Sequence, residues 1–451
     1  MREHRLKIGV SGIRGVVGEF LTPALASAFA QAFGTYVGPG RVVLGRDTRP
    51  SGQMLEHAVA CGLLAAGCEV VLVGIQPTPT IQVFVSATGA RGGIAITASH
   101  NPPEYNALKL FNHGGLFFNH YERGELLDLY HQSEFRHAAN HEIRGVIADP
   151  DGPPRLHLDR VLAHVDAARI RARRFRVALD AVNGAASRMS CEFLRDRLGC
   201  QLDAIAVDPT RPFPRQAEPK PETLGDLAAL VCDRGCDIGF GLDPDGDRLA
   251  VADESGRVLD NDDVLALVVD RVLERVPGDV VVNLTTSSVL DAVAERHGRK
   301  VHRTPVGEAN VVERMQAVGA AIGGEGGNGG IIFSGVQLCR DSFTGMAFLL
   351  DRLAAGGDTV SSLAGRLPLY FRRAAQVAFQ HGRLGSLIQS LEELHPEAAR
   401  DRRDGLKLVW PDRWVHVRAS NTEPVLRVTA EARSERQAED LRQAVLALLA
   451  P

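Results

Sequence analysis

The sequence lacks the features that define several classes of protein. No apolar run among its 451 residues approaches the roughly 18–20 residues that a membrane-spanning helix needs. Met1–Ile8 has no apolar core of the kind found in signal peptides. The formal net charge of −4 does not favour a nucleic-acid partner. These absences predict a cytoplasmic protein that binds neither a membrane nor a nucleic acid.

Cysteine and lysine are scarce as well. The seven cysteines form no C-x2-C pair, so the ligand spacing of a thiolate zinc site is missing. Their odd number and mostly apolar neighbours are typical of reduced packing residues in a reducing compartment. Only five of the 51 basic residues are lysines. One of them, Lys109, draws attention because it lies close to the polar motif that contains Ser99.

A chain of 451 residues is too long for one hydrophobic core, and about three or four domains are expected. Strand-like and helix-like segments alternate through most of it, which indicates α/β units. From about residue 368 the order changes to strand, helix, hairpin, strand and closing helix. We therefore predict three similar α/β domains with mixed sheets and a C-terminal α+β domain. Their predicted ranges are 1–148, 149–253, 254–367 and 368–451.

Individual elements follow from the same patterns. A helix is predicted over 22–37, with Thr22 as its N-cap and Pro23 at its first position. Polar, histidine-rich and proline-rich residues near 131–157 predict a connection between the first two α/β units. Other predicted strands are 41–45, 69–73, 92–97, 106–111, 175–179, 202–207, 279–284 and 300–304, and other predicted helices are 51–66, 184–198, 222–235, 261–275, 287–297, 307–318 and 341–354.

The first chemical motif is the polar turn Thr97-Ala-Ser-His-Asn-Pro102, which directly follows an apolar strand-like run. It presents one hydroxyl, that of Ser99, as a possible phosphoryl acceptor. His100 and Lys109 are candidates for moving the proton. The alternative is an ordinary turn, because serine, asparagine and proline all favour turns.

The second motif, Asp243-Pro-Asp-Gly-Asp-Arg248, places three carboxylates at alternate positions between two strand-like runs. Asp243, Asp245 and Asp247 suit a hard cation such as Mg²⁺, which prefers oxygen ligands. An EF-hand is rejected because its sixth position would be Arg248 rather than glycine. A solvated acidic turn is the alternative. Arg248 would face either a metal-bound phosphoryl group or the acidic cluster.

Two segments near the amino terminus resemble anion-binding loops. Val10–Gly18 is rich in glycine and carries Arg14 at its predicted tip, without the G-x-G-x-x-G spacing of a dinucleotide site. Gly45–Gly52 lies between a predicted strand and a predicted helix, where backbone N–H groups favour anions. Its alternative is a plain strand–helix connection with Ser51 as the cap.

Two later segments suit a phosphorylated sugar. Arg418–Arg427 joins two predicted strands and offers groups for multipoint phosphate binding, namely Arg418, Ser420, Asn421, Thr422 and Arg427. Gly323–Gly330 presents Glu325 and Asn328 among glycines, which suits hydrogen bonds to sugar hydroxyls at close backbone approach. The alternatives are a polar turn and a flexible linker.

Together these motifs resemble those of the α-D-phosphohexomutase superfamily, and the resemblance covers the whole chain. The Ser99 motif is similar to its phosphoserine loop and the aspartate motif to its metal loop. Gly323–Gly330 is similar to its sugar-binding loop, and Arg418–Arg427 to its phosphate-binding loop. The four motifs also stand in the family's order. The resemblance implies one motif per domain and four domains around a central cleft.

The resemblance also implies a mechanism. Ser99 would carry a phosphoryl group, and one Mg²⁺ per chain would be held by that group with Asp243, Asp245 and Asp247. A phosphoryl group would move between C6 and C1 of a hexose phosphate through a bisphosphorylated sugar, and a hexose 1,6-bisphosphate would act as activator. Catalytic residues would be Ser99, His100, Lys109, Arg14 and Arg248; substrate-binding residues would be Glu325, Asn328, Arg418, Ser420, Asn421, Thr422 and Arg427.

The sugar loop departs from the pattern of hexose-specific members, Gly-Glu-Met-Ser-Gly-His. It has no histidine and resembles archaeal-type members described as phosphoglucosamine mutases or mixed phosphomannomutase/phosphoglucomutases. The leading hypothesis is a phosphoglucosamine mutase, with a phosphomannomutase/phosphoglucomutase as the alternative. A catalytically silent sugar-phosphate binding protein and a metal-dependent sugar phosphatase are alternatives of other classes. The oligomeric state is left open between monomer and homodimer.

Overall fold

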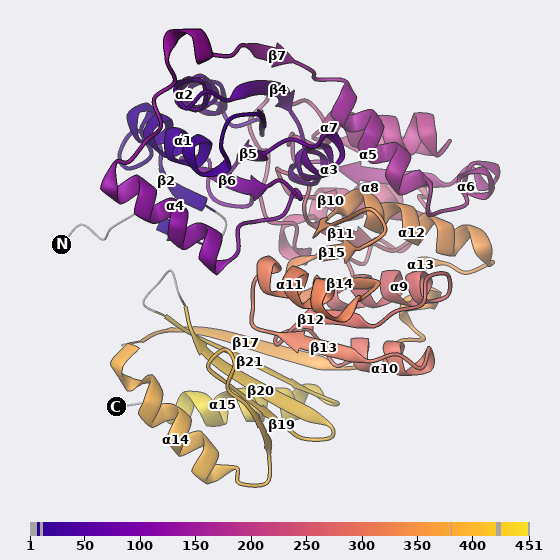
Figure 1. Cartoon of the computed structure of the whole chain (residues 1–451). Coiled ribbons are helices and arrows are strands. Elements are labelled where there is room, and N and C mark those ends of the chain that lie inside the picture. Colours follow the sequence, from indigo (N-terminus) through magenta and orange to yellow (C-terminus); the bar gives the residue numbers. More distant parts are fainter. Residues whose placement is uncertain (1–6, 10–11, 380, 421–424, 450–451) are drawn as a thin grey trace. The chain divides into compact units, whose positions relative to one another are not determined.

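The computed structural model describes residues 7–9, 12–379, 381–420 and 425–449 (Figure 1). Its internal contacts divide the chain into two compact units. The first unit comprises Met1–Asp260 and Gly330–Ser362, and the second comprises Asn261–Gly329 and Leu363–Pro451. One boundary between the two units, at Ser362 and Leu363, falls within the short helix α13 (Val360–Ala364). Among the described residues, no helix has the length and apolar character needed to cross a membrane.

The first unit begins with a seven-stranded mixed sheet in the order β1-β2-β6-β5-β3-β4-β7. Strands β5, β3, β4 and β7 run parallel, whereas β1, β2 and β6 add antiparallel pairs. The strands are β1 (Lys7–Gly9), β2 (Gly12–Val16), β3 (Arg41–Arg46), β4 (Glu69–Ile75), β5 (Gly92–Ile96), β6 (Tyr105–Asn112) and β7 (Val146–Ala148). The helices joined to this sheet are α1 (Pro23–Val37), α2 (Gly52–Ala65), α3 (Thr78–Thr88) and α4 (His120–Gln132).

Helices cover both faces of this sheet, and strand β3 shows why. Successive side chains of a strand point to opposite faces. Val42 and Leu44 belong to a hydrophobic core with residues of α1 and α2, whereas Val43 packs with residues of α3 (Figure 1). The strand is therefore apolar on both faces, as expected for a parallel strand that is buried on each side.

The predicted start of the first helix is confirmed. Thr22 accepts a hydrogen bond from the Leu25 backbone N–H at 3.2 Å, and Pro23 occupies the first turn. Ser51 stands at the N-cap position of α2, as the strand–helix alternative expects, but its side chain makes no capping hydrogen bond. Instead, the Asn106 side-chain amide donates to Ser51 Oγ at 3.0 Å, which ties this connection to β6.

A second sheet of the first unit has the order β11-β10-β8-β9. Strands β8, β9 and β10 are parallel, and β10 and β11 form an antiparallel pair. The strands are β8 (Arg176–Asp180), β9 (Gln201–Ile205), β10 (Ile238–Leu242) and β11 (Leu249–Ala252), and the helices around them are α5 (Gly152–Leu162), α6 (Ala167–Arg173), α7 (Ser187–Cys191) and α8 (Gly225–Arg234). A π-helical stretch, Glu192–Arg197, extends α7. The aspartate motif is the turn between β10 and β11, so the predicted strand flanks are confirmed.

The first unit also contains the antiparallel pair β15 (Gly330–Phe333) and β16 (Gln337–Arg340), followed by helix α12 (Ser342–Ala355). The Asp341 carboxylate caps α12 by accepting hydrogen bonds from the N–H groups of Phe343 and Thr344. Residues of α12 are almost all buried, which explains why the predicted helix 341–354 is found so nearly at its predicted bounds.

The second unit begins with parallel strands in the order β13-β12-β14. They are β12 (Val280–Asn283), β13 (Val301–Thr304) and β14 (Ile322–Glu325), with helices α9 (Asn261–Leu273), α10 (Val289–Arg296) and α11 (Glu308–Val318). The unit ends in an antiparallel sheet, β17-β21-β20-β19-β18. Its elements are β17 (Phe371–Ala378), α14 (Leu384–Leu394), β18 (Ala399–Asp401), β19 (Leu406–Val409), β20 (Arg413–Ala419), β21 (Val425–Ala432) and α15 (Glu435–Ala447). The predicted mixed α/β and terminal α+β architectures are therefore confirmed.

Two local predictions are wrong, and one alternative is excluded. Arg14 is not at a loop tip but in strand β2, where it lies opposite Ala107 of β6. The stretch 131–157 is not only a connection, because it contains β7 and the beginning of α5. The glycine-rich segment is no flexible linker, because Gly323 lies inside β14, where a Cβ atom would lie 2.4 Å from the Val281 carbonyl oxygen. Close backbone approach explains that glycine.

Candidate active site

Ser99 lies in the loop between β5 and β6, beyond the carboxyl end of β5, and is 7% exposed. Its φ of +49° is in the left-handed region, which residues with a side chain seldom adopt. Its N–H donates to Thr97 Oγ1 at 3.0 Å, and its hydroxyl donates to Asp243 Oδ2 at 2.8 Å. His100 Nδ1 lies 3.4 Å from the same hydroxyl. The serine is thus aimed at the aspartate motif, although the two lie on different sheets.

The three aspartates of the second motif form one buried cluster. One oxygen of each carboxylate lies within 4.8 Å of the others, and all three residues are at most 1% exposed. Oδ1 of Asp245 and Oδ1 of Asp247 are buried and have no hydrogen-bond partner. Burial and the neighbouring carboxylates raise the pKa of Asp243 well above its usual value. Buried oxygens without partners suit a divalent cation.

Cationic and hydroxyl groups surround this cluster. Lys109 Nζ donates to Asp245 Oδ2 at 2.6 Å and to Asp247 Oδ2 at 3.2 Å. Burial alone would lower the pKa of Lys109, but the two carboxylates outweigh burial and raise it. Arg340 Nη2 donates to Asp247 Oδ2 at 2.7 Å, and Thr78 Oγ1 donates to Asp245 Oδ2 at 2.6 Å. The lysine is therefore an ammonium ion in this arrangement.

Arg248 faces the acidic cluster, which was one of its two predicted orientations. Its Nε lies 3.7 Å from Asp247 Oδ1 and 3.9 Å from Asp243 Oδ2. Its Nη1 donates to Glu218 Oε1 at 2.7 Å. Burial and the nearby Arg248 charge lower the pKa of His100 to about 3. His100 is therefore uncharged and available as a hydrogen-bond acceptor or donor.

Arg14 contacts the serine loop from β2. Its Nη1 donates to Asn101 Oδ1 at 2.6 Å. The structure thus brings Ser99, His100, Lys109 and Arg14 together with the aspartate motif in the first unit. Thr78, Glu218 and Arg340 belong to the same group of contacts but were missed by the sequence analysis, because nothing in their neighbouring residues marks them as polar site residues.

The segment Gly45–Gly52 fits its strand–helix alternative rather than an anion-binding loop. Gly45 and Arg46 belong to β3, and Arg46 pairs with Glu56 of α2. The Arg49 side chain is 0% exposed and donates its hydrogen bonds within the protein. The backbone N–H groups of Asp47, Arg49 and Gly52 also donate within the protein, so these three are not available to an external anion.

The predicted sugar and phosphate residues lie in the second unit. Glu325 Oε1 accepts hydrogen bonds from Asn283 Nδ2 at 3.0 Å and from the Gly307 N–H at 2.9 Å. Asn328 is half-buried at the end of the short 3-10 helix Gly326–Asn328. Gly326 is needed there because a Cβ atom would lie 1.7 Å from Asp262 Oδ1.

Arg418 and Arg427 are direct partners across strands β20 and β21. Burial and the nearby Arg427 charge contribute to a lowered pKa of Arg418, although Asp404 acts in the opposite direction. Ser420 is 3% exposed, and its N–H donates to the Val425 carbonyl oxygen at 2.8 Å. Two further predicted residues, Asn421 and Thr422, lie outside the described residues.

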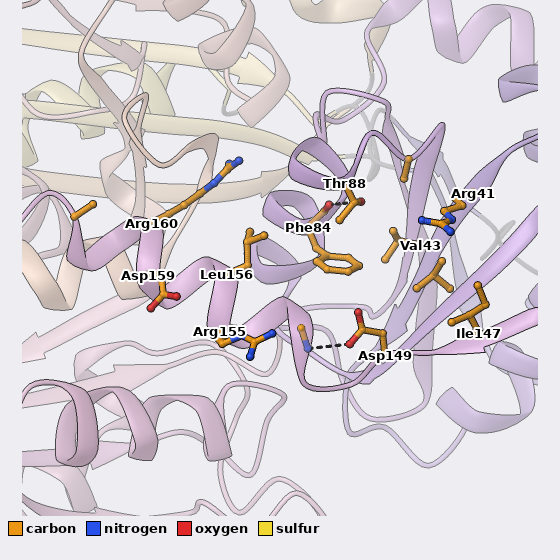
Figure 2. A pocket seen from close by; sticks show the side chains of 14 residues that line it. Arg41, Val43, Phe84, Thr88, Ile147, Asp149, Arg155, Leu156, Asp159 and Arg160 are labelled. Atoms are coloured by element: carbon orange, nitrogen blue, oxygen red, sulfur yellow. Dashed lines mark hydrogen bonds between the residues drawn. The ribbon is translucent and has the colours of Figure 1, made fainter.

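A pocket of about 760 Å³ lies elsewhere in the first unit, beside α3, α5 and the parallel strands (Figure 2). Its lining combines apolar side chains such as Phe84 and Leu156 with the guanidinium groups of Arg41, Arg155 and Arg160. None of the predicted site residues lines it. The polar chemistry is concentrated around Ser99, not in this pocket.

The contacts around Ser99 combine the parts needed for phosphoryl transfer. A hydroxyl lies beside three buried carboxylates that can hold a hard cation, and an ammonium group lies beside the same carboxylates. Such a site can offset the charge of a phosphoryl group and supply a proton.

Comparisons with known proteins agree across the whole chain. Four models described as phosphoglucomutase/phosphomannomutase domains I, II, III and C-terminal match residues 5–137, 155–256, 260–370 and 387–448. A phosphoglucomutase/phosphomannomutase from Thermococcus kodakarensis is 37% identical over 98% of this chain and 98% of the relative. A probable phosphoglucosamine mutase from Methanopyrus kandleri is 36% identical over 96% and 95% of the two chains.

Solved structures give the same result. A phosphoglucomutase/phosphomannomutase family protein from Burkholderia thailandensis superposes with a TM-score of 0.83 at 28% identity, covering 98% of each chain. A putative phosphomannomutase from Thermus thermophilus superposes with a TM-score of 0.83 at 26% identity, covering 99% of each chain. With matching fold, matching domain order and a relative 37% identical over nearly its full length, the chain belongs to the phosphoglucomutase/phosphomannomutase family of α-D-phosphohexomutases.

Proposed function

We propose that this protein is a phosphoglucosamine mutase, which moves a phosphoryl group between C6 and C1 of glucosamine phosphate. The observation that carries the proposal is the 2.8 Å hydrogen bond from Ser99 Oγ to Asp243 Oδ2 within a buried carboxylate cluster. Family membership supports the reaction type, an intramolecular phosphoryl transfer.

In the proposed reaction, Ser99 carries the phosphoryl group in the active enzyme. The bond from phosphorus to Ser99 Oγ breaks as a bond to the free sugar hydroxyl forms, which gives a bisphosphorylated sugar. The released Ser99 oxygen takes a proton from Lys109, and the proton that the sugar hydroxyl loses restores the lysine, so protons balance over the half-reaction. Lys109 suits the proton-donor role because its raised pKa keeps it protonated beside the carboxylates. The second half-reaction returns the other phosphoryl group to Ser99.

Three further residues assist Ser99 in this proposal. His100 lies beside the hydroxyl, and Arg14 fixes Asn101 of the same loop. Arg248 adds a positive charge at the carboxylate cluster, where the phosphoryl group must be bound.

The aspartate cluster fits a magnesium ion. All its donors are hard carboxylate oxygens, and two of them are buried without a hydrogen-bond partner. We assign Asp243, Asp245 and Asp247 as its protein ligands, with the Ser99 phosphate completing the set. When bound, Mg²⁺ would offset negative charge on the transferring group.

The second unit supplies the proposed groups for the sugar and for the phosphate that is not reacting. Arg418 and Arg427 stand directly opposite each other, so their two guanidinium groups suit multipoint binding of one phosphate. Ser420, Asn421 and Thr422 are assigned to the same phosphate. Glu325 and Asn328 are assigned to the sugar hydroxyls. A hexose 1,6-bisphosphate would supply the first phosphoryl group to Ser99.

We further propose the four domains 1–148, 149–253, 254–367 and 368–451, whose order the four family models support. A cytoplasmic location is supported by the cysteines, because Cys61, Cys68, Cys191, Cys200, Cys232 and Cys236 form no disulfide within the described part of the chain. The proposed partners are sugar phosphates, bound by a monomer or a homodimer.

A phosphoglucomutase/phosphomannomutase is the second candidate, because the relative from Thermococcus kodakarensis at 37% identity carries that name. The deciding measurement is kcat/KM for glucosamine, mannose and glucose phosphates in one coupled assay, primed with the matching bisphosphate. A large preference for glucosamine phosphate supports the first proposal. Comparable values for glucose and mannose phosphates support the second.

The Ser99→Ala variant tests the phosphoserine step. Turnover should be lost while folding and cation binding persist, and the mass gain of one phosphoryl group expected for the wild type should be absent from the variant. Near-normal turnover in this variant would overturn the assignment. Sugar phosphates that bind without any covalent phosphate on wild-type Ser99, and without turnover, would instead indicate a silent binding protein.

A further inference from the structure

One buried arginine binds the backbone of the Ser99 loop at four points. Arg49 Nη2 donates to the carbonyl oxygens of Ser99 and Asn101, at 2.7 Å each. Arg49 Nη1 donates to the carbonyl oxygens of Pro102 and Tyr105, at 2.7 and 3.0 Å. A guanidinium group has five N–H donors, so four of them are used on this single loop.

Asp47 links the same arginine to the other side of the Ser99 backbone. The fifth donor of Arg49, Nε, bonds to Asp47 Oδ2 at 3.1 Å. That carboxylate oxygen also accepts from Thr97 Oγ1 at 2.7 Å, and Thr97 Oγ1 accepts from the Ser99 N–H at 3.0 Å. Both the N–H and the C=O of Ser99 are therefore held by one network of Arg49, Asp47 and Thr97, which are each 1% exposed.

The conformation of Ser99 explains why such a network is needed. A left-handed φ of +49° in a non-glycine residue is strained and persists only where its surroundings enforce it. The hydrogen bonds that Ser99 donates to Thr97 and accepts from Arg49 act on the two peptide groups that flank this residue. Without them the loop would relax, and Ser99 Oγ would leave Asp243.

We propose that Arg49 is a positioning residue for the reacting serine. This role rests on the proposed function, in which Ser99 Oγ exchanges a phosphoryl group. Arg49 contacts neither substrate nor reacting atoms; it fixes the loop so that the hydroxyl stays at the carboxylate cluster. The same role also accounts for the segment Gly45–Gly52, whose sequence suggested an anion-binding loop.

The test is the Arg49→Lys variant, measured as full-length enzyme. Lysine keeps the charge beside Asp47 but has one nitrogen, which cannot span four carbonyl groups as the guanidinium fork does. Because small misplacements of reacting groups lower rates by about 100-fold, kcat per folded molecule should fall by roughly that factor. KM for the sugar phosphate should change by no more than about threefold, since substrate contacts are untouched. The rate at which bisphosphate phosphorylates Ser99, followed by intact-protein mass, should fall together with kcat.

Arg136→Lys is the matched control. Arg136 also bonds to a backbone carbonyl, that of Ala66 at 3.4 Å, and to a carboxylate, that of Glu142 at 3.0 Å, but it does not touch the Ser99 loop. Its kcat should equal that of the wild type. A folded Arg49→Lys enzyme with kcat within about twofold of the wild type would overturn the proposal.

Two further outcomes are decisive. If Arg49→Lys does not fold, the Asp47→Asn variant is measured in its place. This substitution weakens the contact between Arg49 and the carboxylate with little change in side-chain shape. An unchanged kcat in the folded Asp47→Asn enzyme would equally overturn the proposal. A wild-type enzyme that turns over without ever carrying a phosphoryl group on Ser99 would contradict the proposed function itself. A phosphorylated wild type with a fully active Arg49→Lys variant would contradict only the positioning role.

Discussion

Lys109 is placed so that one ammonium group serves two carboxylates of the proposed metal site. Its Nζ bonds to Oδ2 of Asp245 and to Oδ2 of Asp247, and its side chain is 9% exposed. A lysine so nearly buried is stable only because it is paired. The Lys109 ammonium group and a bound cation would therefore compete for the carboxylates of Asp245 and Asp247.

This competition leads to a prediction for Lys109→Met. We expect kcat to fall by about 10²–10⁴-fold, because the proton donor is lost. The affinity for Mg²⁺ should rise, because no ammonium group then competes for Asp245 and Asp247. Steady-state kinetics and calorimetric titration with Mg²⁺ measure the two effects. A variant with wild-type kcat would remove Lys109 from the proposed mechanism.

At the scale of elements, strand β2 depends on one glycine. Gly12 has a φ of +123°, and a Cβ atom there would lie 1.8 Å from the Leu108 carbonyl oxygen of β6. The backbone carbonyl cannot move away without breaking the pairing of β2 with β6, which also positions Arg14. The glycine is therefore required by both its φ angle and its close approach.

We predict that Gly12→Ala lowers the free energy of unfolding by about 2–4 kcal/mol, as backbone strain and a steric clash act together. Gly18→Ala is the control, because Gly18 has a φ of +86° but a Cβ atom there would meet nothing within 4 Å. The free energy of unfolding of Gly18→Ala should fall by only about 1–2 kcal/mol, which is the cost of the left-handed conformation for alanine. Urea unfolding of both variants separates the effect of the clash from that of the φ angle; equal losses would contradict the prediction.

Helices α3, α5 and α12 are joined by a buried polar chain. Thr80 Oγ1 lies 2.9 Å from His157 Nδ1, and His157 Nε2 lies 3.1 Å from Asp341 Oδ2. Burial would raise the pKa of Asp341, but His157 and the capping hydrogen bonds outweigh burial and lower it. A lowered carboxyl pKa stabilises the folded state at pH values above the unfolded pKa and ceases to do so as pH falls through the folded value.

Asp341→Asn tests this contribution. The variant keeps a capping oxygen but loses the charge, so we expect it to be less stable at pH 7 by about 1–3 kcal/mol. The difference from the wild type should shrink below about pH 4, where the carboxyl of the unfolded chain begins to be protonated, and vanish as pH falls through the lowered pKa of the folded state. Urea unfolding midpoints as a function of pH provide the measurement. A difference that grew toward acid would contradict the predicted sign.

At the scale of the whole molecule, two compact units carry different parts of the proposed chemistry. The first unit holds Ser99, Lys109 and the aspartate cluster, and the second holds Glu325 and the Arg418–Arg427 pair. A ligand that binds only the folded protein raises its stability as the concentration of the ligand rises above its dissociation constant. A cation that binds the folded protein should therefore raise its measured free energy of unfolding.

We predict that Mg²⁺ at about 100 times its dissociation constant stabilises the wild type by about 2.7 kcal/mol. EDTA should abolish both this effect and turnover. The double variant Asp245→Asn/Asp247→Asn should show neither the stabilisation nor the activity, because two of three carboxylate ligands are neutralised. Thermal unfolding with and without Mg²⁺ is the measurement, and an undiminished shift in the double variant would place the cation elsewhere.

Much of the fold could be predicted from local patterns. Apolar strands such as 41–45 and capped helices such as 22–37 are set by residues close in sequence, and both are found almost at their predicted bounds. Helix α3 was missed because Thr78–Thr88 is rich in β-branched residues, which favour other conformations. Tertiary burial of its apolar side chains against β3 and β4 overrides that preference.

The order of residues specifies which chemical groups are present: a serine, a lysine, three alternating aspartates and two arginine-bearing segments, in the order of one enzyme family. Which of these groups contact one another depends on how the chain folds. Ser99 and Asp243 are 144 residues apart, and Lys109 and Asp245 are 136 apart, so no local pattern could report their contacts. Folding also places the Arg49 side chain in the interior, where it donates hydrogen bonds to four carbonyl groups of the strained loop. Short-range sequence cannot reveal these contacts.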